Sequence, residues 1–188
     1  MSDLSLLVVV ASTRPGRVGL PVSQWFVDAA KANGGFQVSV ADLAEENLPL
    51  LDEPHHPRLA RYEHDHTRRW SEKVAAADAF VFVAPEYNYG IAPSLKNALD
   101  YLHHEWRYKP ASVVSYGGVS AGTRSAMALH ASAYALNLFM ISQAVNIPFV
   151  HAQISDGRFE PNETTGTAAV AMLDELARVA GALKSLRA

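Results

Sequence analysis

Near its N-terminus the chain reads LSLLVVVA at residues 4–11, followed at once by STRPGR at residues 12–17. The first run is apolar and rich in β-branched residues without period-two alternation, a pattern typical of a parallel strand covered on both faces. The second run predicts a turn, and a helical pattern with an apolar stripe begins near Val18 and stops before Gly34-Gly35. These residues therefore predict a strand–loop–helix unit.

The same kinds of pattern recur along the rest of the chain. Further strands are expected at 36–40, 79–84, 112–116 and 145–150. Further helices are expected at about 59–76, 93–104, 123–143 and 164–186, with a long loop over 42–58. Strands that alternate with helices imply a parallel sheet built from right-handed crossovers. Five strands predict an α/β three-layer sandwich with the flavodoxin-like order 2-1-3-4-5, and no repeat or linker divides residues 1–188, which we expect to form one domain.

The composition is that of a globular protein, and it excludes several classes of protein and of chemical reaction. Of the 188 residues, 49% are hydrophobic and 19% are charged, which argues against a disordered chain and an integral membrane protein. Cysteine is absent, so any redox chemistry must reside in a bound cofactor. The formal charge of −3 gives no reason to expect nucleic acid or a membrane as a partner. No signal peptide is readable, and we expect a cytoplasmic protein.

Three loops follow strands at the edge where such a sheet binds its ligands. In this strand order the ligand lies beyond the carboxyl ends of the strands, at the switch point between strands one and three. That rule selects residues 11–19, 84–92 and 115–122, which are rich in Gly, Pro, Ser or Tyr.

The first loop has the chemistry of a phosphate site. It places Ser12, Thr13, Arg14 and Arg17 between a strand and a helix N-terminus, where free N–H groups and the helix dipole favour an anion. The alternative is a helix N-cap with solvated arginines. The loop lacks G-x-G-x-x-G, and G-x-x-x-x-G-K-[ST] occurs nowhere, so a monophosphate fits better than a pyrophosphate or a triphosphate.

The other two loops suit a planar ring. Residues 85–90 read PEYNYG, where backbone groups can address the edge of a flavin and Tyr87 or Tyr89 can pack on its face. The alternative is a rigid turn capped by Asn88. The three glycines within 115–122 let the backbone approach a ligand closely, or form a tight strand-to-helix turn.

Four motifs occur together in one order: ASTRPGR at 11–17, PEYNYG at 85–90, LKNALD at 95–100 and SYGG at 115–118. The combination resembles the NADPH-dependent FMN reductase family, which includes flavodoxin-like quinone, azo and chromate reductases. The resemblance extends over most of the chain. Its most specific part is P-E-Y-N followed by L-K-N-A-x-D.

The resemblance implies that FMN is the cofactor, and it indicates which part of FMN each loop residue contacts. The phosphate is then held by the first loop, namely Ser12, Thr13, Arg14, Arg17, Val18 and Gly19. The isoalloxazine ring is lined, largely through main-chain atoms, by Pro85, Glu86, Tyr87 and Asn88, with Ser115, Tyr116, Gly117 and Gly118 on its other edge. Glu86 is expected to be structural or ring-lining rather than a general base. Ala11 departs from the glycine common in the family, and its methyl group is either harmless or crowds the loop.

The resemblance further implies an NAD(P)H oxidoreductase. A hydride passes from NADPH or NADH through FMN to a small acceptor such as a quinone, an azo compound or a free flavin, so no catalytic acid–base residue is required. The alternatives are a flavodoxin-like electron carrier and an FMN-binding regulatory module without nicotinamide turnover.

Two further features concern partners. Residues 126–141 are expected to form a helix that is apolar nearly all round, which requires burial against a second subunit or beneath neighbouring helices of the same chain. The resemblance favours homodimers, often paired into homotetramers.

The histidines within 55–66 and at 103–104 could form a metal site or belong to a solvated face. We expect a solvated face and no metal. Residues 62–70 are expected near the cofactor mouth.

Overall fold

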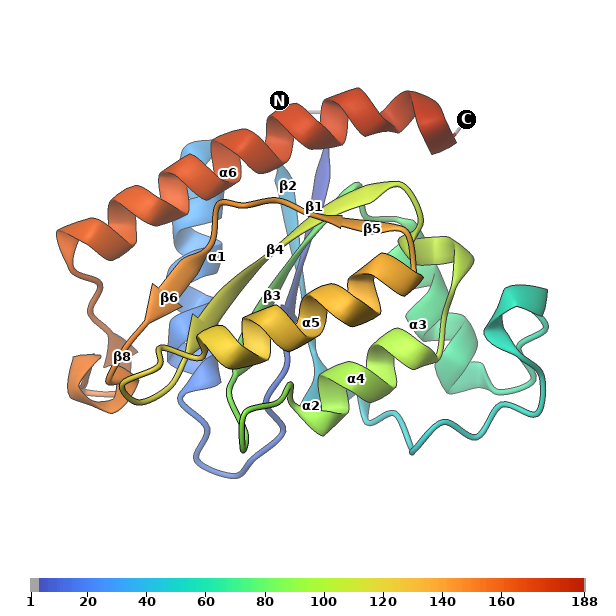
Figure 1. The fold of residues 1–188 in the computed structure, drawn as a ribbon, viewed down its shortest axis with the longest axis horizontal. Helices are drawn as coiled ribbons and strands as arrows, with labels where there is room; N and C mark the ends of the chain where they lie inside the picture. Colours follow the sequence, from blue (N-terminus) through green and yellow to red (C-terminus); the bar gives the residue numbers. More distant parts are fainter. Residues whose placement is uncertain (1–3, 188) are drawn as a thin grey trace.

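The computed structural model describes residues 4–187, and a parallel sheet forms its centre (Figure 1). The strands are β1 (Ser5–Val10), β2 (Gln37–Asp42), β3 (Ala79–Pro85), β4 (Lys109–Tyr116), β5 (Leu138–Met140) and β6 (Val145–Ile147). They run in the order β2-β1-β3-β4-β5, and β6 pairs with β4 as well. All pairings in this sheet are parallel. The predicted strand order 2-1-3-4-5 is confirmed.

Two strands share the fifth position of the sheet, where the sequence predicts one. β5 pairs with the first residues of β4, and β6 pairs with its last residues. The helix expected to run to Gln143 ends at Ala135, so that prediction was wrong. Asn137 adopts a left-handed conformation (φ 52°), which ends the helix, and the chain then extends along β4. An apolar run such as 136–141 suits a buried helix and a buried strand equally well.

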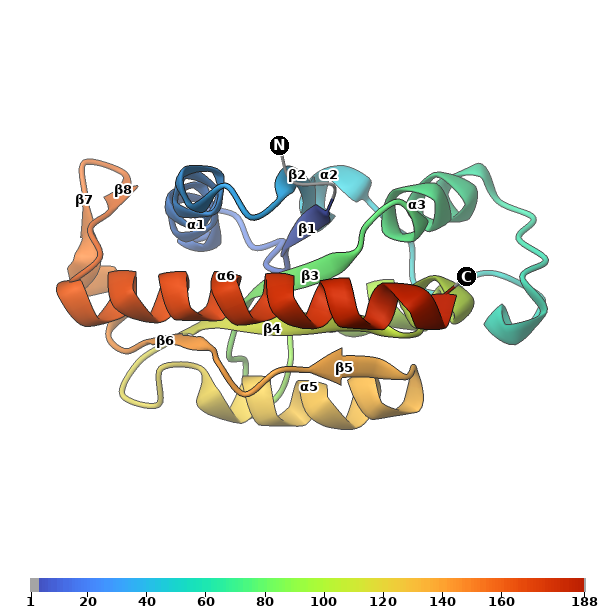
Figure 2. The ribbon, with the colours of Figure 1, turned by 90° about the horizontal axis from the view of Figure 1, so that it is seen from above.

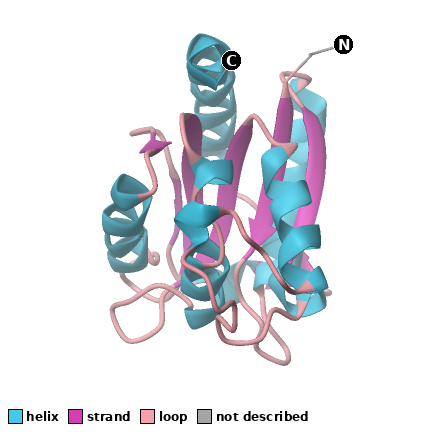
Figure 3. Cartoon of the chain, turned by 90° about the vertical axis from the view of Figure 1, so that its right-hand side faces the viewer, coloured by secondary structure: helices cyan, strands magenta, loops and turns pink. Residues whose placement is uncertain are grey.

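Helices cover both faces of the sheet (Figure 3). They are α1 (Gly19–Asn33), α2 (Leu43–Glu46), α3 (Asp65–Ala75), α4 (Pro93–Asp100), α5 (Thr123–Ala135) and α6 (Glu163–Leu183). On one face α1 and α6 bury Phe26 and Met172 against β1 and β3. On the other face α3, α4 and α5 bury Trp70, Leu99 and Leu129. The predicted three-layer sandwich is therefore present. Across residues 4–187, none of the helices has both the length and the apolar character needed to span a membrane.

The connections contain short elements that the sequence does not predict. They are single 3₁₀ turns at Pro57–Leu59, His104–Trp106, Val150–Gln153 and Lys184–Arg187, and a hairpin of β7 (Ile154–Ser155) and β8 (Arg158–Phe159). The hairpin lies beside α1 (Figure 2), where the rings of Trp25 and Phe159 are 5.1 Å apart.

Several predicted boundaries are wrong for local reasons. The expected loop over 42–58 contains α2, and the helix expected from Leu59 begins only at Asp65. It starts late because Ala60 is left-handed (φ 49°) and His64 is extended. The helix expected over 93–104 ends at Asp100, and the strand expected over 145–150 ends at Ile147.

Within residues 4–187, only one face of α5 packs against other elements. Leu129 and Ala133 are buried, whereas the side chains of Met127 and Tyr134 are 68% and 86% exposed. Neighbouring helices of the same chain therefore do not bury this helix on all sides.

Candidate functional site

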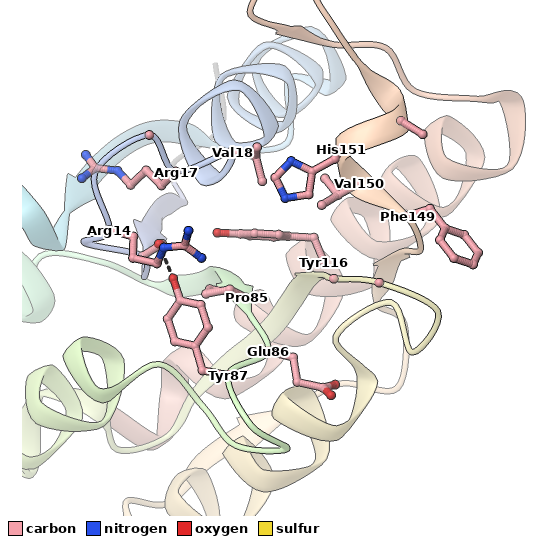
Figure 4. Close-up of a pocket in the computed structure, with 15 residues that line it drawn as sticks. Arg14, Arg17, Val18, Pro85, Glu86, Tyr87, Tyr116, Phe149, Val150 and His151 are labelled. Atoms are coloured by element: carbon pink, nitrogen blue, oxygen red, sulfur yellow. Dashed lines mark hydrogen bonds between the residues drawn. The ribbon is translucent and has the colours of Figure 1, made fainter.

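A cavity of about 480 Å³ opens at the carboxyl ends of β1, β3 and β4 (Figure 4). This is the switch point where the strand order reverses, which is where sheets of this kind bind ligands. Its lining comes from four segments: Ser12, Arg14, Gly16, Arg17 and Val18; Pro85, Glu86 and Tyr87; Tyr116, Gly117 and Gly118; and Phe149, Val150, His151 and Ala152.

Ten of the fourteen predicted site residues line this cavity, and the other four are Thr13, Gly19, Asn88 and Ser115. Thr13 is exposed on a neighbouring groove, and Asn88 is exposed in the turn after β3. Gly19 is buried as the first residue of α1. The Ser115 hydroxyl is buried within the protein and donates to the Ala121 carbonyl oxygen at 2.8 Å.

Residues 149–152 form a wall that the sequence does not predict. The N–H groups of Phe149 and Val150 donate to the carbonyl oxygens of Gly118 and Gly117, at 3.0 and 3.1 Å. These contacts fold the segment back over the third loop. The available signal was a fifth strand that ends at the same edge of the sheet. Its predicted end at Val150 placed Phe149 and Val150 inside the strand, and the loop after it was not considered as part of the site.

The end of the cavity next to α1 is rich in hydrogen-bond donors. The hydroxyls of Ser12 and Tyr87 are hydrogen-bonded at 2.7 Å, which joins the first loop to the second. The Arg14 side chain lies beside them at the cavity (Figure 4). The first turn of α1 adds unpaired backbone N–H groups and the positive end of the helix dipole. This end of the cavity therefore favours an anionic group.

Arg17 lies in the same loop but directs its guanidinium group elsewhere. Its Nη2 pairs with the carboxylate of Asp42, the last residue of β2, and both side chains are largely buried. Asp42 also accepts a hydrogen bond from the Ala44 N–H at 3.0 Å, which caps α2. Figure 4 shows the Arg17 side chain extended away from Tyr87 and Tyr116. The charge of Arg17 is thus neutralised by the protein itself.

Glu86 has its carboxylate bound to the third loop. It accepts hydrogen bonds from the Ser120 hydroxyl at 3.0 Å and the Arg124 N–H at 3.2 Å, and it pairs with the Arg124 guanidinium at 2.5 Å. Burial by itself raises the pKa of Glu86, but the contacts with Arg124 and Ser120 outweigh it and lower that pKa. An ionised carboxylate with these partners is a poor general base, and it holds the second loop against the start of α5.

The second loop is a tight hairpin turn. The N–H of Tyr87 donates to the Gly90 carbonyl oxygen at 3.1 Å, and the Gly90 N–H donates back at 2.9 Å. Asn88 and Tyr89 both have positive φ, 49° and 69°, as the two central residues of such a turn require. The guanidinium carbon of Arg124 lies 3.7 Å from the centre of the Tyr89 ring. The turn that the sequence analysis considers is present, and it borders the cavity through Tyr87.

These residues fit FMN. The lining also includes apolar groups such as Pro85 and Val150, which suit a planar ring, beside the polar side chains of Glu86 and His151. At the polar end, the buried Tyr116 hydroxyl has no hydrogen-bond partner among residues 4–187. Ala11 does not face the cavity: it is fully buried and belongs to the core cluster of Leu7 and Val9.

The histidine-rich segment lies elsewhere. The rings of His64 and His66 are stacked 5.2 Å apart, and His66 Nε2 lies 3.0 Å from an Asp52 carboxylate oxygen. Trp70 is buried in the core, and the Tyr62 hydroxyl donates to Glu105 at 2.8 Å. No residue of 62–70 lines the cavity. Over the described range 4–187, no three His, Asp or Glu side chains are grouped as metal ligands would be.

The fold and the cavity together define a nucleotide-binding protein of the flavodoxin-like class. The chain belongs to the NADPH-dependent FMN reductase family, whose family model matches residues 4–152. It is an oxidoreductase that uses FMN and NAD(P)H.

Similar proteins agree with this assignment. An NAD(P)H-dependent FMN reductase of Schizosaccharomyces pombe is 38% identical over 131 residues, which cover 69% of this chain and 66% of that protein. An NAD(P)H-dependent FMN reductase of Nectria sp. is 32% identical over 163 residues, 81% of each chain. The flavoenzyme FerB of Paracoccus denitrificans, an NAD(P)H:(acceptor) oxidoreductase, matches with a TM-score of 0.74 over 95% of this chain and 98% of its own. Its sequence identity is 19%, so this likeness concerns the fold.

Proposed function

We propose that the cavity binds FMN with its phosphate against Ser12, Arg14 and the N-terminus of α1, and its ring beside Pro85 and Gly117. The observation that carries this proposal is the polarity of the cavity, with donors and the positive charge of Arg14 at one end and apolar groups such as Pro85 and Val150 in the rest of the lining. Helix N-termini and arginine bind phosphate, and flat rings bind between apolar walls. In this proposal residues 1–188 form one FMN-binding domain.

The chain positions the reactants, and FMN, when bound, supplies the hydride chemistry. The hairpin turn at 87–90 and the pair of Glu86 with Arg124 hold the second loop in one place. A loop held in this way keeps the ring edge fixed relative to an incoming nicotinamide, which is where the protein contributes to the rate. Glu86 is assigned no proton transfer because Arg124 and Ser120 already occupy its carboxylate.

We propose NADPH or NADH as the donor and a small flat acceptor such as a quinone, an azo compound or a free flavin. Exposed apolar side chains support a flat acceptor. Phe149, which lines the cavity, is 60% exposed, and Tyr89 and Val119, in the second and third loops, are 71% and 80% exposed. Planar molecules stack readily on such side chains.

The test is an anaerobic absorption spectrum of the protein reconstituted with FMN, recorded before and after NADPH or NADH is added. We expect a perturbed flavin spectrum that bleaches with at least one donor and recovers when a quinone is added. A bound flavin that neither donor bleaches would instead favour an electron carrier or a regulatory module. A protein that binds no flavin would contradict the proposal.

We also propose that the protein forms homodimers or dimers of dimers through the outer face of α5, whose exposed Met127 and Tyr134 support an interface. Size-exclusion chromatography with light scattering tests this. The double variant Met127→Asp/Tyr134→Asp should shift the mass to that of the monomer. Val170→Asp, at an exposed apolar position of α6, should leave the mass unchanged.

A cytoplasmic location is part of the same proposal, because reduced nicotinamides are generated inside cells. Fractionation of cells that express the tagged protein tests it, and recovery outside the cytoplasm would contradict it.

A further inference from the structure

The hydroxyl of Tyr116 is buried at the polar end of the cavity without a partner. Tyr116 is 4% exposed, and no residue of the described part of the chain has the geometry of a hydrogen bond with its hydroxyl, although the Ser12 hydroxyl lies close enough to lower the pKa of Tyr116. Figure 4 shows the ring lying across the cavity with the hydroxyl directed toward Arg14. Burying an unsatisfied hydroxyl destabilises a folded protein, so this placement calls for an explanation.

The start of α1 leaves room for this hydroxyl. A Cβ atom at Gly19 would lie 2.6 Å from the Tyr116 oxygen, closer than such atoms approach in proteins. Gly19 is the first residue of α1, where unpaired N–H groups favour an anion. The Tyr116 oxygen thus lies against the helix end that the phosphate is expected to occupy.

The first loop by itself supplies fewer side-chain donors than the sequence suggests. Arg17 is paired with Asp42, and the Ser12 hydroxyl shares a hydrogen bond with Tyr87. Among residues 4–187, no carboxylate is paired with Arg14. The three terminal oxygens of a phosphate accept several hydrogen bonds, so a further side-chain donor at this end has an acceptor within the proposed subsite.

We propose that the Tyr116 hydroxyl donates a hydrogen bond to the phosphate of FMN, so that Tyr116, Ser12 and Arg14 form the phosphate subsite. This inference rests on the proposed binding of FMN in the cavity. It moves Tyr116 from the ring edge, where the sequence resemblance places it, to the opposite end of the cofactor. Burial, together with the nearby Tyr87, raises the pKa of the Tyr116 phenol and outweighs the opposite effects of Ser12 and the two arginines. The hydroxyl therefore keeps its proton and acts as a donor at neutral pH.

The test compares FMN with riboflavin, which lacks the phosphate, on the wild-type protein and on Tyr116→Phe. The substitution removes only the hydroxyl. We expect the Kd for FMN to rise about tenfold to a hundredfold, as for the loss of a hydrogen bond to a charged group, and the Kd for riboflavin to stay unchanged. Both constants are measured by the quenching of flavin fluorescence. Tyr108→Phe, at a tyrosine outside the cavity lining, is the matched control and should change neither constant.

Thermal unfolding of the flavin-free proteins gives a second readout. Because Tyr116→Phe removes an unsatisfied buried hydroxyl, its melting temperature should equal or exceed that of the wild type. Weaker FMN binding in an equally stable protein is a result that a purely structural role for the hydroxyl does not produce.

The other outcomes overturn the inference in distinguishable ways. If Tyr116→Phe weakens the binding of FMN and of riboflavin equally, Tyr116 contacts the ring instead of the phosphate. If neither Kd changes, the Tyr116 hydroxyl does not contact the flavin. A wild-type protein that binds riboflavin as tightly as FMN would remove the phosphate subsite but leave a flavin site. A wild-type protein that binds neither flavin would overturn the proposed function as well.

Discussion

Arg17 follows β1 in the loop beside the cavity, yet its guanidinium group pairs with Asp42 at the end of β2. Arg14, three residues earlier, has no carboxylate partner in the described chain and lies beside Tyr87 and Tyr116 (Figure 4). The two arginines of one loop therefore have different tasks. Arg14 is available to an anionic ligand, whereas Arg17 fastens the loop to the neighbouring strand.

The first prediction concerns Arg14. Arg14→Ala should raise the Kd for FMN by about a hundredfold, since a bidentate contact with a phosphate is among the stronger hydrogen-bonded pairs. Riboflavin affinity and the melting temperature should hardly change, because the side chain is exposed. Flavin fluorescence titration measures the effect. Arg69→Ala, at an exposed arginine of α3, is the control, and an unchanged FMN affinity for Arg14→Ala would remove the phosphate role.

The second prediction concerns the pair of Asp42 and Arg17. Asp42→Asn keeps a side-chain oxygen to cap α2 but leaves the largely buried Arg17 without its counter-charge. The free energy of unfolding in urea should fall by about 3 kcal/mol, as when one partner of a buried pair is removed. Adding Arg17→Met to this variant should restore part of the lost free energy of unfolding.

A surface pair provides the control for that experiment. Asp65 and Arg68 are paired at 2.7 Å on α3, but both side chains are more than half exposed. Asp65→Asn should therefore change the unfolding free energy by less than about 1 kcal/mol. Equal effects at the two aspartates would show that Asp42 is no more important than a surface carboxylate.

The third prediction concerns the pH dependence of Glu86. Its pKa in the folded protein lies below the ordinary value of 4.5. A carboxyl with a lowered pKa stabilises the fold above its unfolded pKa, and this contribution disappears as the pH falls through the folded pKa. Glu86→Gln should therefore be less stable than the wild type near neutral pH, with the difference shrinking below pH 4.5. Urea unfolding across this range measures it, and a difference independent of pH would contradict the assignment.

The fourth prediction concerns Lys109. Its ammonium is buried and donates to the carbonyl oxygens of Val74 and Ala75 at 2.9 and 3.0 Å, at the end of α3. Burial, with a smaller effect from Arg187, lowers its pKa from 10.5 to about 8. Between these values the unfolded chain holds the proton more firmly than the folded one, so stability rises with pH.

Comparison of wild type and Lys109→Met isolates this contribution. The stability of the wild type relative to the variant should increase between pH 8 and pH 10, by about 2 kcal/mol at most. Urea unfolding at both pH values is the measurement. Lys31→Met, at an exposed lysine, should show no such change. If the difference in unfolding free energy between wild type and Lys109→Met is the same at both pH values, the pKa of Lys109 in the folded protein is ordinary.

The fifth prediction concerns the histidine-rich segment. His64 and His66 contact Asp52 and lie outside the cavity lining. The double variant His64→Ala/His66→Ala should therefore keep the wild-type ratio of FMN to protein after gel filtration. A normally folded variant that loses its flavin would instead bring this segment to the cofactor, for example across a subunit contact.

Much of the fold and part of the site could be predicted because their signals are local. The apolar run at 4–11 predicts a buried strand wherever it occurs, and PEYNYG at 85–90 contains Asn88, a residue type that accepts the positive φ of its tight turn. Strand order and loop position then follow from general rules for parallel sheets. The strands and loops that obey these rules appear in the structure near the expected residues.

The amino-acid sequence by itself thus determined the layer architecture, the strand order and the three loops at the ligand edge. The tertiary structure alone decided the end of α5, the wall at 149–152, the direction of Arg17 and the unpartnered hydroxyl of Tyr116. Each of these depends on a contact between segments that are distant along the chain or on the space between them, such as β5 against β4. Local patterns indicate which residues are apolar or able to turn, but pairing between distant residues exists only after the sheet has brought them together.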